Sequence, residues 1–386
     1  MDVTLIKKLA NKLGISTDAL LIPYYLIPYN FLNGYAFTPL RVVFEITYRC
    51  NLYCQMCPLA NWKKEKTETK APDADINKEL DTAEIKTFID ELKSLKTRAI
   101  MITGGEPFLR QDMLEILDYI KNKGIYCSII SNGTLINNDT AKDLVNIGNE
   151  IISFSLDGTK DTHNRIRGRG DSFSKIYNTV ETIQRFKNGR ANPKVNFNFT
   201  ISALNQDNLD EIVDVAHDLK INMINFLYLF YTSESNLSQT SEILKMGTLK
   251  PENQNINDEI KQIDINILKE SIRKTEEKAK KYNVSLNFRP PLKGDEIEKR
   301  FFDPNFAYCQ RCFYPWFETR LDPFGNIYPC SIDIPMGNIR VNSLKSIWNG
   351  KKYSNFRMRL KRYKLLPACA KCCKLNNKLW SHLPCI

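Results

Sequence analysis

The chain has 386 residues, 42% of them hydrophobic, and its 55 Lys and Arg outnumber 44 Asp and Glu to give a net charge of +11. This length and composition exclude a minimal fold that depends on cross-links, and allow one large domain with a satellite. Acidic residues are interspersed among the basic ones, so we interpret the positive balance as a solvated Lys-rich surface. We therefore expect no nucleic-acid partner.

The N-terminal region contains the most apolar stretch, residues 19–32. This stretch is too short to span a bilayer and includes Pro23 and Pro28. We expect it to pack on the main domain or on a partner subunit, and we expect no transmembrane segment. No signal peptide opens the sequence, which predicts a cytoplasmic protein whose thiols stay reduced.

From residue 41 onward, short β-branched runs alternate with amphipathic helical segments, the pattern of βα units around a parallel sheet. Asp81 and Glu84 are spaced as a cap pair at the start of the first helical stripe. The polar segment 231–257 is interpreted as an inserted loop, and 63–78 as another. The six expected strands are 41–47, 99–102, 125–130, 151–155, 195–201 and 223–229.

Three cysteines follow the first expected strand. Cys50, Cys54 and Cys57 form a C-x3-C-x2-C pattern on a loop. Three thiolates can hold three irons of a [4Fe–4S] cluster and leave the fourth iron without a protein ligand. Zinc is the competing metal, but a structural zinc site has four closing ligands, and the first local histidine is His163.

This spacing, followed by Gly104-Gly105-Glu106 at the end of the second strand, resembles the radical S-adenosylmethionine (SAM) superfamily over most of the chain. The resemblance implies that the free iron binds the amino and carboxylate groups of SAM. It further implies that Met56 packs on the adenine, that the two glycines let the backbone approach the ligand, and that Glu106 bears the charge near the ammonium group.

Two further strand ends agree with this resemblance. It implies that Asn132, after the third strand, and Ser155, at the end of the fourth, contact SAM, and that Arg165 or Arg167 holds its carboxylate. An electron from the reduced cluster would cleave SAM to methionine and a 5′-deoxyadenosyl radical, which abstracts hydrogen from a substrate. The resemblance and the six strands predict an α/β fold, a partial (β/α)6 TIM-like barrel with a small cysteine-rich α+β C-terminal domain.

Cysteine becomes dense after Pro290 and Pro291, where a C-terminal domain is expected to begin. A predicted hairpin with its turn at 322–326 would bring distant thiols together. Four such thiols alone could equally bind zinc. Beside a radical SAM core they resemble the SPASM/twitch extension, which implies an auxiliary [4Fe–4S] cluster in the shorter twitch arrangement, because Lys378 stands where the full pattern has another cysteine. The implied ligands are Cys312, Cys330, Cys369 and Cys372.

The remaining cysteines are interpreted as thiols outside the clusters. Cys309, Cys373 and Cys385 either are spare or bind an incomplete second cluster, and Cys127, inside a strand, is expected in the core. The aromatic residues 313–317 beside Cys312 either line the substrate cavity or shield the cluster as plain core. The expected domains are an extension at 1–40, the barrel at 41–290 and the auxiliary cluster domain at 291–386.

These features predict an oxidoreductase that dehydrogenates a small molecule such as a sugar, aminocyclitol or nucleoside, with an external low-potential donor of the flavodoxin or ferredoxin type. One alternative is a peptide-modifying maturase, but the roughly forty residues before Arg41 are short for the peptide-binding domain of such proteins. The other alternative is a non-catalytic zinc protein that binds nucleic acid.

Overall fold

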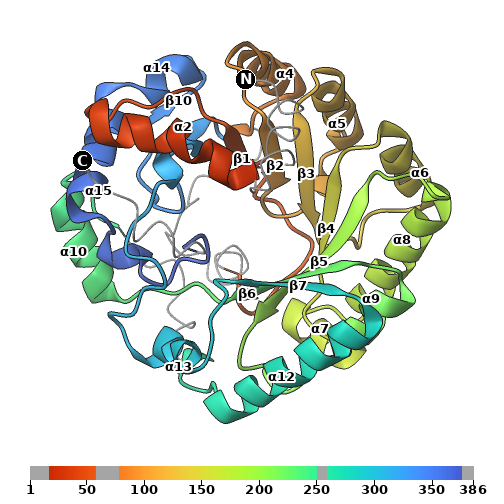
Figure 1. The fold of residues 1–386 in the computed structure, drawn as a ribbon. Coiled ribbons are helices and arrows are strands. Elements are labelled where there is room, and N and C mark those ends of the chain that lie inside the picture. Colours follow the sequence, from red (N-terminus) through yellow and green to blue (C-terminus); the bar gives the residue numbers. More distant parts are fainter. Residues whose placement is uncertain (1–16, 58–77, 250–258, 376–386) are drawn as a thin grey trace.

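The computed structural model describes residues 17–57, 78–249 and 259–375. Strands line the inside of a curved ring and helices cover its outside (Figure 1). Seven parallel strands follow one another in chain order, each paired with the next. They are β1 (Arg41–Glu45), β2 (Ala99–Thr103), β3 (Tyr126–Ser131), β4 (Ile151–Ser155), β5 (Lys194–Ile201), β6 (Met223–Tyr228) and β7 (Ser285–Arg289).

The predicted α/β partial barrel is confirmed, and all six predicted strands are present within a few residues of their expected ends. The sequence analysis missed β7, which pairs with β6 and extends the barrel wall by one strand. Strand β7 lies between a long helix and a pair of prolines. Polar and apolar residues alternate over only five positions there, too few to indicate a strand from the sequence.

The outer faces of the strands bury apolar side chains against helices. Phe44 of β1, for example, packs edge-on against Phe88 of α4 with ring centroids 6.2 Å apart. The predicted cap pair of Asp81 and Glu84 forms a reciprocal capping box at the start of α4. The outer helices are α4 (Thr82–Ser94), α5 (Met113–Asn122), α6 (Asn138–Ile147), α7 (Lys160–Arg167), α8 (Ser172–Lys187), α9 (Glu211–Asp218) and α12 (Ile265–Tyr282).

The segment expected as an inserted loop contains a helix instead, α10 (Glu234–Leu244). The Ser233 side chain caps it by accepting from the backbone of Asn236, and Leu237 and Leu244 are buried beneath it. Only these two large apolar residues mark its buried face, so its polar composition concealed the helical period. Residues 63–77 of the other expected insertion, and residues 250–257, lie outside the described residues.

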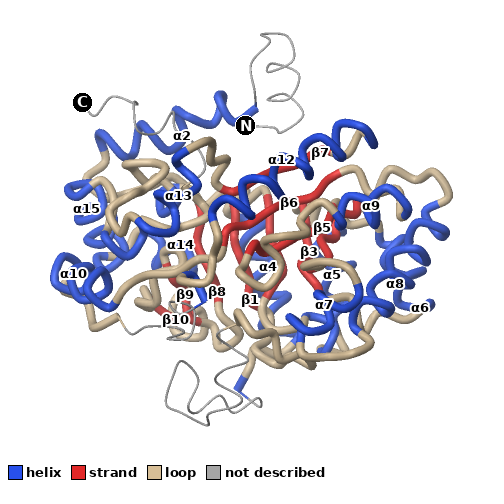
Figure 2. Tube along the Cα trace, turned by 90° about the horizontal axis from the view of Figure 1, so that it is seen from below, coloured by secondary structure: helices blue, strands red, loops and turns tan. Residues whose placement is uncertain are grey.

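The C-terminal part continues the same sheet. Strand β8 (Glu318–Leu321) pairs in parallel with β1, and the predicted hairpin joins it to β9 (Asn326–Tyr328). The Asp322 side chain accepts from the backbone of Phe324 and Asn326, which fixes the turn. The other elements are α13 (Asp295–Phe302), β10 (Gly337–Asn338), α14 (Leu344–Trp348) and α15 (Lys351–Tyr363). Figure 2 shows strands enclosed by helices from a second direction.

The N-terminal helix α2 (Thr17–Phe31) packs on the cysteine-rich part of the chain. Its Tyr29 ring lies 4.7 Å from the ring of Phe313 and 4.8 Å from that of Trp316. The apolar N-terminal stretch thus covers the cysteine-rich part of the same chain, whereas packing on the main domain or on a partner subunit was expected. Among the described residues, no helix combines the length and apolarity needed to cross a bilayer.

Candidate functional site

The three-cysteine loop lies at the carboxyl end of β1, held between two other strand-end segments. Backbone N–H groups of Tyr53 and Gln55 donate to the carbonyls of Arg167 and Ile166 at 3.3 and 2.9 Å. These bonds fasten the loop to the last turn of α7. Within the loop, the N–H of Cys57 donates to the carbonyl of Cys54 at 3.1 Å. The thiols are therefore presented by a fixed backbone.

The glycine motif after β2 packs directly against this loop. The N–H of Gly105 donates to Thr47 O at 2.7 Å, and a Cβ placed on Gly105 would lie 2.1 Å from Arg49 O. Gly104 has a φ of +128° and equally little room, 2.4 Å from Thr47 O. Only glycine allows the second strand end to approach the cysteine loop this closely.

A cavity of about 230 Å³ opens between these strand ends. It brings together the three cysteines, Arg167 and five of the six other residues that the resemblance assigned to SAM, Glu106 being absent from the lining. Thr200 of β5 also reaches the cavity, although no motif in the sequence marks it. The described lining residues are Cys50, Leu52, Cys54, Met56, Cys57, Thr103, Gly104, Gly105, Ile130, Ser131, Asn132, Ser155, Arg167 and Thr200.

Glu106 lies fully buried behind the cavity wall. Its carboxyl accepts from the Ser131 hydroxyl at 2.8 Å, from the Asn132 N–H at 2.7 Å and from the Phe108 N–H at 3.1 Å. Burial raises the pKa of Glu106 to about 7, against these hydrogen bonds and the charge of Arg167, which lower it. In this position Glu106 ties the end of β2 to the end of β3.

Asn132 joins the third strand end to the cysteine loop. Its amide nitrogen donates to Asn51 Oδ1 at 2.9 Å, and the amide of Asn51 donates to the Thr134 hydroxyl at 2.8 Å. Asn132 Oδ1 accepts from both the backbone and the hydroxyl of Thr134. The side chain is thus held in one orientation at the edge of the cavity.

The structure distinguishes the two candidate arginines. Arg165 donates to Leu204 O, outside the cavity lining, whereas Arg167 lines the cavity. Arg167 pairs with the fully buried Asp157 at 2.5 Å and approaches Cys54 Sγ with Nη1 at 3.5 Å. The sequence analysis assigned no role to Asp157. Its pairing with Arg167 places a fixed positive charge beside the cysteine loop.

The four C-terminal cysteines implied as auxiliary ligands lie in one thiol-rich region. Burial raises the pKa of the Cys312, Cys330 and Cys369 thiols, and Cys330 and Cys312 raise that of Cys369 further by mutual repulsion. Cys372 follows on the same turn, its N–H donating to Cys369 O at 3.0 Å. Thiols that repel one another when ionised are stabilised by bound metal cations.

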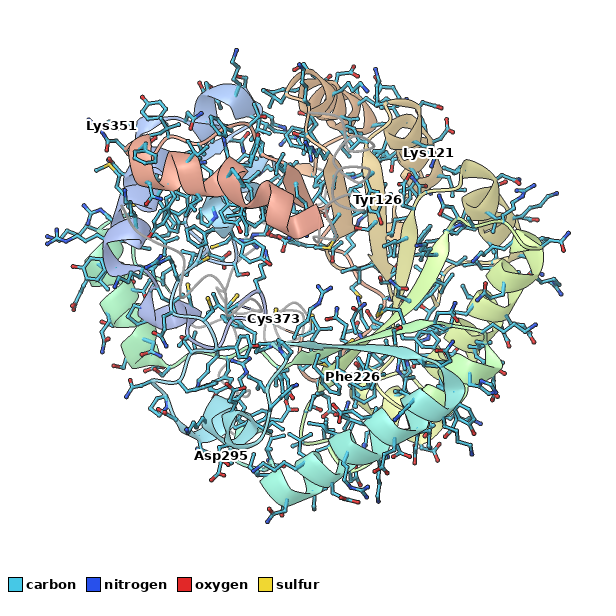
Figure 3. The ribbon with its side chains drawn as sticks, viewed as in Figure 1. Lys121, Tyr126, Phe226, Asp295, Lys351 and Cys373 are labelled. Atoms are coloured by element: carbon cyan, nitrogen blue, oxygen red, sulfur yellow. The ribbon has the colours of Figure 1, made fainter. Side chains whose placement is uncertain are left out.

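Further cysteines accompany these four in the C-terminal part of the chain. Cys373 forms a thiol–thiol hydrogen bond with Cys372, and it lies on the inner side of the ring in Figure 3, whereas Lys351 lies at the periphery. Cys309 is buried and donates to Arg311 O at 3.1 Å. Cys127 lies in β3 with no exposed surface, as predicted for a core residue. Cys385 lies outside the described residues.

Aromatic and charged groups surround the C-terminal thiols. Phe313 and Trp316 are completely buried, which favours the core interpretation over a cavity lining. Lys374 pairs with the buried Glu318 at 2.5 Å. Within the described ranges, no three His, Cys, Asp or Glu side chains are grouped as for a single metal ion. A four-iron cluster spreads its thiolates more widely than one ion does, because each thiolate binds a different iron.

The fold and site together define a partial-barrel protein with one thiol loop open to a cavity and a second thiol-rich region beside it. The family model of the radical SAM superfamily matches residues 44–219, and that of the SPASM iron-sulfur cluster-binding domain matches residues 312–373. Residues 44–219 therefore form a radical SAM domain, and residues 312–373 form a SPASM-type domain. Proteins of this class hold a SAM-binding [4Fe–4S] cluster and auxiliary iron–sulfur clusters.

Several characterised proteins are similar in sequence. Fe-coproporphyrin III synthase of Methanosarcina barkeri is 33% identical over 50% of this chain and 45% of the relative. The AdoMet-dependent heme synthase of the same organism is 24% identical over 80% of this chain and 82% of its own. Mycofactocin maturase MftC of Mycolicibacterium smegmatis is 28% identical over 46% of this chain and 42% of the relative. This chain thus spans less than half the length of the first and third of these relatives.

Solved structures agree on the fold. Streptococcus suis SuiB bound to S-adenosylmethionine superimposes with a TM-score of 0.60 at 17% identity, covering 89% of this chain and 75% of SuiB. Native anSMEcpe with bound AdoMet gives 0.56 at 17% identity, covering 82% of each chain. At these identities the similarity establishes the barrel architecture.

Proposed function

We propose that the protein is a radical SAM oxidoreductase that removes two electrons from a small organic substrate. The observation that carries the proposal is the cavity at the strand ends, which joins three thiols to the backbone of two glycines and to Arg167. Cys50, Cys54 and Cys57 would hold three irons of one cluster. The fourth iron, which would have no protein ligand, would face the cavity and could bind a chelating cofactor there.

The remaining cavity groups would bind and orient SAM. Met56 offers a thioether to the adenine, and Asn132 and Ser155 offer polar groups of fixed orientation. Arg167, held by Asp157, offers a guanidinium to the SAM carboxylate. Gly104 and Gly105 let the backbone approach the amino group, and Glu106 supports this edge from behind instead of touching the cavity.

The C-terminal thiols would hold the auxiliary cluster on Cys312, Cys330, Cys369 and Cys372. When bound, the first cluster and SAM would supply abstraction of one hydrogen atom from the substrate, and the auxiliary cluster would supply an acceptor for the second electron. The buried aromatic side chains around Cys312 keep water from that region. A low-potential donor of the flavodoxin or ferredoxin type would supply the first electron, and the cytoplasm is the proposed compartment.

A small-molecule substrate is supported by the heme synthase that aligns with 80% of this chain. Modification of a peptide is the second candidate, supported by the similarity to mycofactocin maturase MftC. The two candidates share the cofactor chemistry and differ in the substrate.

The proposal is tested by incubating the anaerobically reconstituted protein with SAM and dithionite. We expect 5′-deoxyadenosine and methionine in equal amounts. Formation of neither product by a protein that contains iron and sulfide in cluster ratio would contradict the proposal.

A further inference from the structure

Inward-facing side chains of the four strands β4 to β7 form a continuous polar row. In register, Ser155 of β4 pairs with Asn198 of β5, Asn198 with Asn225 of β6, and Asn225 with Asn287 of β7. The side-chain amides of Asn198, Asn225 and Asn287 lie within hydrogen-bonding distance of one another in turn, at 2.9 and 2.8 Å. The row starts at Ser155, which lines the SAM cavity, and continues along the inner wall to the end of the described parallel barrel strands.

The next row toward the strand ends leads to an arginine. Thr200, which lines the cavity, is in register with Leu227, and Leu227 with Arg289. Arg289 is exposed and ends β7. With the Asn287 amide oxygen turned toward it, Arg289 Nε and Nη2 each donate to that oxygen at 2.9 Å. One edge of the guanidinium is thereby fixed, and the edge formed by Nη1 and Nη2 remains available.

Other inward-facing arginines of the barrel are neutralised by carboxylates. Arg41 pairs with Glu318, and Arg320 of β8 pairs with Glu45 at 3.1 Å. Among the described residues, Arg289 has no carboxylate partner. Arg289 is therefore a positive charge without a carboxylate on the inner wall, in the same row of the sheet as the cavity-lining Thr200.

We propose that Arg289, oriented by Asn287 at the end of the asparagine row, binds a carboxylate group of the substrate. A guanidinium edge presents two parallel N–H groups at the spacing of the two carboxylate oxygens. The asparagine amides beside it bind neighbouring polar groups of the same molecule. This inference rests on the proposed function, because it concerns the substrate that the radical would attack.

The experiment measures binding to the reconstituted holoenzyme with SAM present, using matched acids and methyl esters. The probes are coproporphyrin III with its tetramethyl ester, and uridine-5′-carboxylic acid with its methyl ester and with UMP. We expect at least one acid to bind about tenfold tighter than its ester, since that ratio corresponds to about one charge-assisted hydrogen-bonded pair. Tighter binding of UMP than of the matched acid would overturn the carboxylate assignment in favour of phosphate.

Variants assign the preference to Arg289. Arg289→Gln should abolish the preference for the acid, and Arg289→Lys, which keeps the charge, should retain part of it. Arg273→Met is the matched control, because Arg273 is an exposed arginine on α12 that pairs with Glu270 and Glu277. Equal binding of acid and ester, no binding of any acid, or an unchanged preference in both Arg289 variants would overturn the inference. Deoxyadenosine formation, measured in parallel, reports the proposed function separately.

Discussion

The two thiol regions of this chain differ in what surrounds them. Cys50, Cys54 and Cys57 line a cavity, and the positively charged Arg167, which approaches Cys54, lines that cavity too. The C-terminal thiols lie instead among buried aromatic rings, with Lys374 and Glu318 paired beside them. An open site suits a ligand that comes and goes, whereas an enclosed one suits electron transfer without ligand exchange.

The largest effect should come from the open site. Cys54→Ala removes one of three thiolates, and we expect deoxyadenosine formation to fall to below about 1% of the unmodified protein, because a cluster on two thiolates is not held. The amount of deoxyadenosine is measured by chromatography of the SAM reaction. Cys127→Ala is the matched control, since Cys127 is buried in β3 away from the cavity lining. If both variants lose activity equally, the assignment of the loop is wrong.

The enclosed site should respond differently. Cys330→Ala should lower the iron content by about four per chain, the content of one [4Fe–4S] cluster, while most of the deoxyadenosine formation remains. Iron analysis and the SAM reaction on the same sample measure the two quantities. Loss of deoxyadenosine with unchanged iron would reverse the roles that we assign to the two thiol regions.

The difference between the two regions also explains what could be predicted from the sequence. The open site could be predicted from the sequence because its thiols, glycines and Asn132 follow consecutive parallel strands, whose ends meet at one edge. The enclosed site could be predicted from the local spacing of its cysteines and from the hairpin around Asp322. Pairings between distant segments gave no local signal, as with β8, which lies parallel to β1 with Glu318 opposite Arg41, 277 residues apart.

Side-chain partners were harder to predict than strand ends. The resemblance predicted that the Glu106 carboxylate lies beside the ligand. In the structure this carboxyl accepts hydrogen bonds from Ser131 and Asn132 at the end of β3 instead. That direction depends on how the two loops after β2 and β3 pack, which the sequence does not reveal. Asp157 precedes α7 and Arg167 is the last residue of that helix, and nothing in the sequence distinguishes Arg167 from Arg165. Thr200 is one of several alternating residues of β5, and only the barrel's curvature brings it to the cavity.

A smaller effect should separate folding from ligand binding at the open site. Arg167→Met leaves the buried Asp157 without its partner, and we expect a loss of about 3–5 kcal/mol in the free energy of unfolding. The double variant Asp157→Asn/Arg167→Met should recover much of that stability while SAM binding stays about tenfold weaker. Urea unfolding and the SAM-induced change in the cluster's EPR spectrum measure the two. Recovered affinity in the double variant would show that Arg167 acts only on folding.

The smallest effect concerns Glu106, behind the open site. Its pKa is raised from 4.5 to about 7, so between these pH values the folded state keeps a proton that the unfolded state has released. Stability should therefore fall as pH rises from about 4.5 to 7, by about 3 kcal/mol, and level off above. Glu106→Gln should lack this slope, since an amide does not titrate. The difference in unfolding free energy between the two proteins across this pH range measures it, and an identical slope in both would mean that the three hydrogen bonds keep Glu106 ionised throughout.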